Sequence, residues 1–206
     1  AGSSLLFASC PAWAKQKTFR VNDLHSQLNE TLVSEIIKVD SACELKKLVK
    51  NSNKMKCQLS ICGGRHAGGG QQFATNRILV DTTSLNKVIN FDREKGFLEV
   101  ESGIRWPQLL NYLEENQKNV EIPWGITQKQ TGTDYLTLGG TLGANAHGQG
   151  LIFKPIIQDV ESFEIIDSNG NLVKCSRIEN SELFSLAIGG YELFGIISSI
   201  KLKLTE

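Results

Sequence analysis

The sequence has little of what marks several large classes of protein. Aromatic residues make up 7% of its 206 residues, and 22 basic residues balance 22 acidic ones, so the net charge is zero. No basic stretch is interleaved with aromatic residues, which argues against a nucleic-acid-binding surface or attraction to an anionic membrane. No apolar run is long enough for a transmembrane segment. With 40% hydrophobic and 21% charged residues, the composition is that of an ordinary globular protein.

Several motifs of catalysis and binding are also missing. Without Gly-Lys-Ser or Gly-Lys-Thr there is no P-loop, and without H-E-x-x-H or a similar His/Cys spacing we expect no metal site. No G-x-S-x-G element supports a nucleophilic serine. The cysteines form no C-x-x-C pair, so we expect free, mostly buried thiols that do not identify the redox compartment. They are Cys10, Cys43, Cys57, Cys62 and Cys175.

Residues 1–30 are expected to form an N-terminal tail. Ala12-Trp13-Ala14 follows a short apolar stretch and has the small-x-small pattern of a signal-peptide cleavage site. No basic region precedes it, so two interpretations stay open: the remnant of an export signal, or a disordered tail. The compartment is accordingly cytoplasmic or exported to a periplasm, and the sequence does not choose between them.

The rest of the chain predicts an α+β domain. A helix is expected over residues 41–50 with Ser41 as N-cap and Glu44 three residues later, and a second helix opens at Trp106-Pro107. Asn169-Gly170 predicts the turn of a hairpin, and Asn180 is expected to cap a further helix. Strands are expected over residues 31–40, 58–62, 77–81, 96–103 and 194–206. A boundary near 91–95 divides the domain into lobes of about 31–92 and 93–206.

Two glycine clusters, at residues 61–73 and 138–150, need an explanation. A glycine in an ordered segment costs roughly 0.5–1 kcal/mol relative to alanine. Phe73 and Phe153 stand where the last glycine of a G-x-G-x-x-G fingerprint belongs, and neither cluster precedes a convincing helix, so a Rossmann site is excluded. Two such loops could clamp a long anionic ligand such as a pyrophosphate. Two tight turns without a ligand remain the alternative, and His66 and His147 within them are either functional or ordinary loop residues.

The motifs resemble the FAD-binding (PCMH-type) domain of the vanillyl-alcohol oxidase / p-cresol methylhydroxylase superfamily, over roughly residues 31–206. GGRHAGGGQ (63–71) is similar to its first pyrophosphate loop, DYLTLGGTLGANAHG (134–148) to its second flavin loop, and NSELFSLAIGGYELFGIISSIKLKL (180–204) to its terminal stretch. Cytokinin dehydrogenases, sugar-lactone oxidases and decaprenylphosphoryl-ribose oxidases are the relatives that it resembles most. The implied fold has two lobes, each a small sheet flanked by helices.

The resemblance implies FAD as cofactor and names the residues that contact it. His66 matches the position that carries the flavin covalently in some members, although others lack this histidine and bind FAD without a covalent link. Ala67 stands where many members have serine. The expected FAD-binding residues are Cys62, Gly63, Gly64, Arg65, His66, Ala67, Gly70, Gln71, Gly132, Thr133, Thr137, Gly139, Gly140, Gly143, His147, Gly148 and Ile197. For Arg65, a surface ion pair is the alternative to a phosphate contact.

The implied reaction is the oxidation of a CH–OH or CH–NH donor, a small molecule, by hydride transfer to flavin N5. The electrons then pass to oxygen or another acceptor. Asp134 is the expected catalytic residue, by analogy with the base of cytokinin dehydrogenases, but it aligns only with a gap, and a turn aspartate is the alternative. In the family a substrate or cap domain follows and supplies the substrate pocket and usually the catalytic base, and we expect it after residue 206. Two other interpretations stay open: a non-catalytic FAD or nucleotide module without that domain, and an interaction domain without any ligand.

Overall fold

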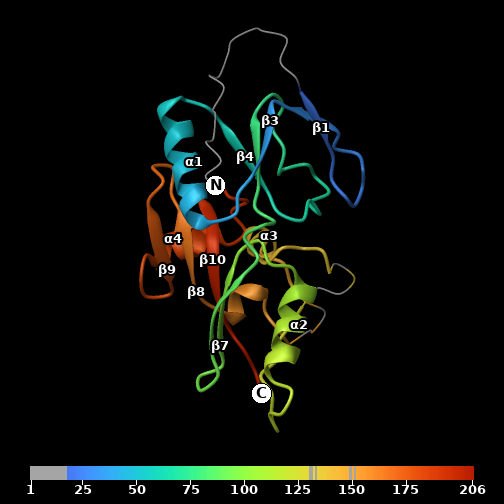
Figure 1. Cartoon of the computed structure of the whole chain (residues 1–206), viewed down its shortest axis with the longest axis vertical. Helices are drawn as coiled ribbons and strands as arrows, with labels where there is room; N and C mark the ends of the chain where they lie inside the picture. Colours follow the sequence, from blue (N-terminus) through green and yellow to red (C-terminus); the bar gives the residue numbers. More distant parts are fainter. Residues whose placement is uncertain (1–17, 130–131, 133, 149, 151) are drawn as a thin grey trace, which may run out of the picture.

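The computed structural model describes residues 18–206 except 130–131, 133, 149 and 151. One lobe is built on a three-stranded parallel sheet in the order β3-β5-β4, with the helix α1 packed on it (Figure 1). Its elements are β3 (Glu35–Lys38), α1 (Ala42–Lys54), β4 (Leu59–Cys62) and β5 (Ile78–Asp81). Because the three strands are parallel, the ends of β4 and β5 lie at the same edge of the sheet, where the first glycine cluster begins.

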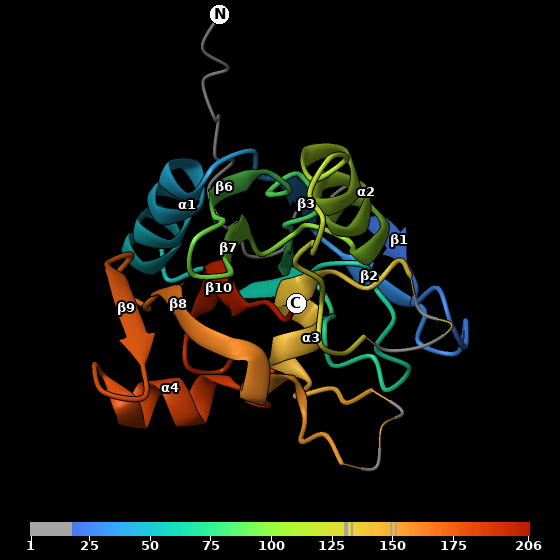
Figure 2. The ribbon, with the colours of Figure 1, turned by 90° about the horizontal axis from the view of Figure 1, so that it is seen from below.

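The second lobe is built on a five-stranded antiparallel sheet in the order β6-β7-β10-β8-β9. Helices α2 and α4 lie on opposite sides of the molecule, as Figure 2 shows. The elements are β6 (Val88–Asp92), β7 (Phe97–Glu101), α2 (Trp106–Asn116), α3 (Leu138–Gly143), η1 (Ile156–Asp159), β8 (Val160–Ile166), β9 (Leu172–Ser176), α4 (Ser181–Ala187) and β10 (Ile196–Lys203). The chain passes from the three-stranded sheet to the five-stranded sheet between β5 and β6. This is a few residues before the lobe boundary expected near residue 92.

Local sequence signals explain the elements that the sequence predicted. The Ser41 hydroxyl accepts a hydrogen bond from the Glu44 N–H at 3.2 Å, and the Glu44 carboxylate accepts one from the Asp40 N–H at 2.9 Å. The first bond is the side-chain cap of α1, and the second ties the residue before the N-cap to the first turn of the helix. In the β8–β9 hairpin Gly170 has φ +73°, a conformation that glycine adopts without strain.

Two buried clusters make up most of the core. The larger surrounds β7, β8, β10 and α2 and includes the fully buried Trp106 and Phe163. The smaller lies between α1 and the parallel sheet, and it also contains Ile166 and Ile196 from the antiparallel sheet. Apolar burial of this kind contributes roughly 25 cal/mol per Å². The shared cluster therefore packs the two lobes against each other and brings the end of β4 close to the start of β10.

The N-terminal residues 18–30 are not separate from this domain. β1 (Phe19–Val21) pairs antiparallel with β2 (Thr31–Val33), and the Leu24 N–H donates to the Arg65 carbonyl at 2.9 Å. The predicted signal remnant around Ala12-Trp13-Ala14 lies outside the described residues. Within the described part of the chain, no helix has the length and apolar character needed to span a membrane.

Two local predictions are wrong, and a third is correct only in part. Residues 138–143, expected as loop, form α3, because Thr137 caps this short helix and Gly139 packs directly on Ser102. Asn180 occupies the N-cap position of α4 as expected, but its side chain makes no capping hydrogen bond: its φ is +49°, and its side-chain amide donates to the Lys174 carbonyl at 2.7 Å. Cys57 is disulfide-bonded rather than free, since linear spacing does not report which thiols meet in space. Cys62 and Cys175 are free and buried as expected, whereas Cys43 is free and exposed.

Candidate functional site

A cleft of about 410 Å³ lies between the end of the parallel sheet, α3 and the start of β10. In Figure 1, α3 lies in the middle of the molecule, between β4 above it and β7 below it. The walls come from β4 and the first glycine cluster, from residues 136–144, and from residues 191–197. The three motifs that carried the family resemblance thus converge on one cleft, although they are far apart in the sequence.

The two glycine clusters touch each other at this cleft. A Cβ on Gly63 would overlap the hydroxyl of Thr137, and a Cβ on Gly64 would overlap the carbonyl oxygen of Tyr135. Real Cβ atoms cannot approach so closely, so only glycine allows this packing at both positions. Two glycines of the first cluster are thereby explained, because they bring the first loop against the segment that begins α3.

Residues 63–67 all line the cleft, and none of their five backbone N–H groups has a hydrogen-bond acceptor among the described residues. Buried or half-buried amides without partners are uncommon in folded proteins. A run of such amides in a turn is a typical binding site for phosphate oxygens. Arg65, in the middle of the run, has φ +57°, so the loop adopts a left-handed conformation there. These residues fit an anionic pyrophosphate.

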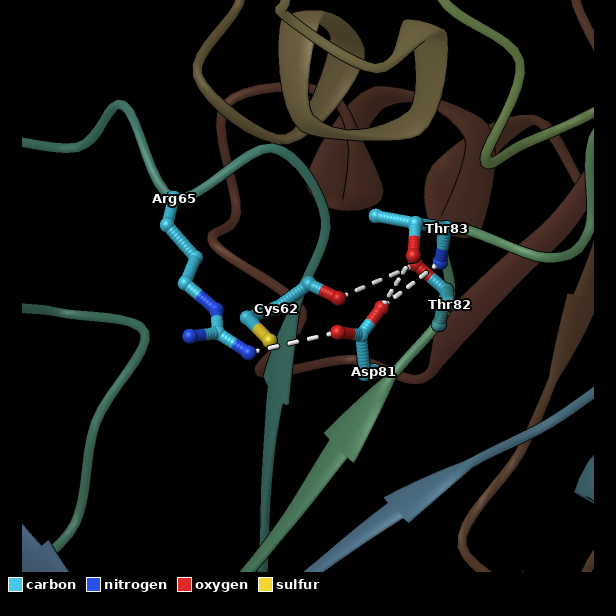
Figure 3. A network of polar contacts seen from close by, with 5 residues as sticks. All are labelled: Cys62, Arg65, Asp81, Thr82 and Thr83. Carbon is cyan, nitrogen blue, oxygen red and sulfur yellow. Dashed lines mark hydrogen bonds and ion pairs between the residues drawn. The ribbon is translucent and has the colours of Figure 1, made fainter. Parts of the chain in front are cut away.

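Arg65 forms an ion pair with Asp81 at the end of β5, with 3.3 Å between Nη2 and Oδ2 (Figure 3). The other carboxylate oxygen of Asp81 accepts the Thr83 N–H at 2.9 Å. The structure therefore shows the ion pair, which was the alternative for Arg65, and a phosphate contact of Arg65 stays a prediction. Burial, followed by the nearby Asp81 carboxylate, raises the pKa of the Cys62 thiol to about 11, which keeps this cleft residue neutral.

His66 lines the cleft and is half-buried. Its Nε2 is buried and has no hydrogen-bond partner among the described residues. Burial lowers the pKa of His66, and the charges of His25 and Arg105 lower it further. The imidazole is therefore neutral at pH 7 and keeps a free lone pair, the form in which a histidine can accept a hydrogen bond or bond covalently.

The structure separates the expected FAD-binding residues into those that line the cleft and those that do not. Those that line the cleft are Cys62, Gly63, Gly64, Arg65, His66, Ala67, Gln71, Thr137, Gly139, Gly140, Gly143 and Ile197. Four others, Gly70, Gly132, His147 and Gly148, do not line it. Thr133 lies outside the described residues. The contact of each with FAD stays a prediction.

His147 and Asp134 both lie away from the cleft walls. His147 is exposed, and its Nδ1 is 2.9 Å from the Gly148 carbonyl oxygen. Asp134 forms an ion pair with Lys129, and 56% of its side chain is exposed. A catalytic role for Asp134 therefore stays a prediction that the cleft geometry does not strengthen. Among the described residues, no group of three or more His, Cys, Asp or Glu side chains is arranged to hold a metal ion.

Sequence reasoning missed Glu192, which lines the cleft from the connection between α4 and β10. Its carboxylate accepts the Ile197 N–H at 3.1 Å. Burial raises the pKa of Glu192 to about 8, and the hydrogen bond from Ile197 opposes this only in part. Tyr191 and Glu192 have φ of +48° and +63°, so two non-glycine residues in succession are left-handed. The one available signal was an acidic residue between Gly189-Gly190 and a β-branched strand.

Comparison with known proteins agrees with this geometry. A family model described as "FAD binding domain" matches residues 33–176. Cytokinin dehydrogenase 3 of Oryza sativa subsp. japonica is 34% identical over 157 residues, which cover 73% of this chain and 28% of that protein. The mitochondrial L-galactono-1,4-lactone dehydrogenase of Arabidopsis thaliana is 25% identical over 186 residues, covering 88% of this chain and 29% of that protein. The chain thus spans less than a third of these relatives.

A solved structure of alkyldihydroxyacetonephosphate synthase has the same fold over most of this chain. The TM-score is 0.71 at 20% sequence identity, and the match covers 86% of this chain and 34% of that one. The match confirms the predicted α+β class, with small sheets flanked by helices in the FAD-binding fold.

Proposed function

The chain belongs to the FAD binding domain family, and from this premise we propose that it is the FAD-binding half of an oxidoreductase. The observation that supports the proposal most is the run of five amides without acceptors among the described residues at 63–67, in a loop that Gly63 and Gly64 allow to pack closely against Thr137 and Tyr135. Relatives named as dehydrogenases and oxidases support the class of activity.

In this proposal the residues of the first loop hold the pyrophosphate of FAD, and those around Thr137 and Ile197 form the facing wall. FAD, when bound, supplies an acceptor for a hydride at flavin N5, so that a CH–OH or CH–NH donor can be oxidised. The electrons then pass to oxygen or to another acceptor. The donor is a small molecule, and Asp134 is the proposed base.

His66 is the proposed point of covalent attachment. Its Nε2 has no partner among the described residues, and its neutral imidazole is the nucleophilic form. A histidine that served only the fold would be expected to have its buried nitrogen hydrogen-bonded. In the non-covalent alternative the same nitrogen accepts a hydrogen bond from the cofactor.

The visible spectrum of the purified protein, recorded before and after acid precipitation, tests both parts of the proposal. A yellow pellet shows covalent flavin, and mass spectrometry should then place the added FAD mass on the peptide that contains His66. A yellow supernatant above a white pellet keeps the FAD-binding function and removes the covalent link. A protein that stays colourless after incubation with FAD contradicts the proposed function.

A further inference from the structure

Asp23 is a fully buried carboxylate in the N-terminal segment that precedes the residues matched by the family model. Its Oδ1 accepts the backbone N–H groups of His25 at 3.0 Å and Gln27 at 3.2 Å, and also that of Ser26. Its Oδ2 accepts the Asn29 side-chain amide at 2.8 Å. Burial alone would raise the pKa of Asp23, but the bonds from Asn29, Ser26 and Gln27 lower it below its usual value. The carboxylate is therefore ionised and organises the turn of residues 22–29 around itself.

This turn is bonded to the first glycine loop on both sides of His66. The Leu24 N–H donates to the Arg65 carbonyl at 2.9 Å, and the Asn29 amide donates to the Gly68 carbonyl at 2.7 Å. The same Asn29 amide nitrogen donates to Asp23, so one side chain joins the buried carboxylate to the loop. A Cβ on Gly70 would lie 2.9 Å from the Asn29 side-chain oxygen, so the loop and the turn are also in close contact there.

The contacts have a direct consequence for the cofactor site. A loop rich in glycine has many backbone conformations, and ordering it on binding has an entropic cost of roughly 1–2 kcal/mol for each residue that becomes fixed. Two carbonyls held by the turn, those of Arg65 and Gly68, bracket His66 and Ala67. Holding these two carbonyls restricts the loop to one backbone conformation. The N–H groups of the loop are then already oriented before a ligand binds.

We propose that Asp23 is a positioning residue for the cofactor site: its turn holds the first glycine loop in the conformation that binds FAD and presents His66. The inference rests on the proposed function and extends it to residues 22–29, which the family model does not include. It predicts that disrupting the turn lowers the affinity for FAD strongly and lowers the melting temperature of the apoprotein only slightly.

The chain offers a matched control in Asp167. This aspartate also organises a turn, because its carboxylate accepts the N–H groups of Asn169 at 2.9 Å and Asn171 at 2.7 Å. The turn lies in the β8–β9 hairpin and does not line the cleft. Asp167→Asn therefore removes the same kind of carboxylate from the same kind of turn, without a connection to the glycine loop.

The experiment compares Asp23→Asn, Asn29→Ala and Asp167→Asn with the unsubstituted protein. Each apoprotein is titrated with FAD well below its melting temperature, and the bound fraction is measured with free FAD still present, from the change in flavin fluorescence. We expect the FAD concentration for half-saturation to rise about tenfold or more for Asp23→Asn and Asn29→Ala, and less than twofold for Asp167→Asn. Melting temperatures without FAD are recorded for all four proteins.

Asn29→Ala keeps the experiment decisive if Asp23→Asn does not fold, because it removes the bond to Gly68 and leaves the other bonds of the Asp23 carboxylate in place. Equal half-saturation for Asn29→Ala and the unsubstituted protein would overturn the inference, and so would equal effects of Asp23→Asn and Asp167→Asn. If the unsubstituted protein itself took up no FAD, the proposed function would fail, which is a different result from normal FAD uptake by the variants.

Discussion

Gly63 and Thr137, which are 74 positions apart, pack so closely that a Cβ on Gly63 would overlap the Thr137 hydroxyl. Gly63 follows β4 and Thr137 begins α3, so this contact joins the two glycine clusters at the wall of the cleft. The Thr137 hydroxyl also accepts the Gly140 N–H at 3.3 Å. A side chain at position 63 would therefore disturb two features at once. One is the loop whose amides lack acceptors among the described residues, and the other is the cap of α3.

Gly63→Ala is expected to lower the free energy of unfolding by about 1–3 kcal/mol, the usual cost of overpacking, and to abolish FAD uptake. Gly68→Ala is a control within the same loop, because a Cβ there would have no closer neighbour than His25, at 4.0 Å. Chemical denaturation and the flavin-to-protein ratio measure the two effects. Equal behaviour of the two variants would contradict the role assigned to the contact with Thr137.

Glu192 makes the stability of the apoprotein depend on pH. Its pKa is about 8 in the folded protein and 4.5 when unperturbed. Between these values the folded state binds a proton that the unfolded state has lost, so the contribution of Glu192 to stability falls as pH rises from about 4.5 to about 8. Because Glu192 as a residue is only half-buried, we expect a loss of only about 1–2 kcal/mol over that window.

Urea denaturation at pH 5, 6, 7 and 8 without FAD measures this loss. Glu192→Gln should flatten the profile, since glutamine does not titrate. Glu115→Gln, at an exposed position of α2, is the control and should leave the slope as it is in the unsubstituted protein. A slope that Glu192→Gln leaves unchanged would show that other groups cause the dependence.

The thiols should differ strongly in reactivity. Only the thiolate reacts, and a pKa of about 11 leaves Cys62 almost fully protonated at pH 8. Labelling of Cys62 should be about 100-fold slower than that of an ordinary thiol, whereas the exposed Cys43 should react first. Peptide mapping after timed alkylation measures both rates. Asp81→Asn should speed the labelling of Cys62, because it removes the carboxylate that contributes to the raised pKa.

The two loop histidines should also differ. His66→Ala removes the buried nitrogen that has no partner among the described residues, and acid precipitation should then release all flavin into the supernatant. His147→Ala should leave the distribution of flavin unchanged, because His147 is exposed and contacts the Gly148 carbonyl rather than the cleft. Flavin absorbance of pellet and supernatant checks the outcome. Flavin that stays in the pellet of His66→Ala would place the covalent link elsewhere.

Local chemistry made part of the structure predictable. Ser41 and Glu44 specify the start of α1 within four residues, and Asn169-Gly170 specifies a hairpin turn, because each of these signals acts between neighbours in the chain. The family was predictable because its three motifs are short and contiguous. In contrast, α3 was missed: its glycines disfavour a helix, and only the packing of Gly139 on Ser102 and the cap at Thr137 outweigh that preference.

By itself, the sequence determined the α+β class through periodicity and caps, which are properties of contiguous residues. Its three contiguous motifs also carried the resemblance that implied the family and the FAD cofactor. Only the tertiary structure decided which predicted residues line the cleft, that Arg65 pairs with Asp81, that Glu192 lines the cleft, and that the Asp23 turn is bonded to the first glycine loop. The physical reason is that burial, desolvation and contact depend on which distant segments meet. The packing of the two lobes through one shared core determines those contacts, and no stretch of neighbouring residues specifies them.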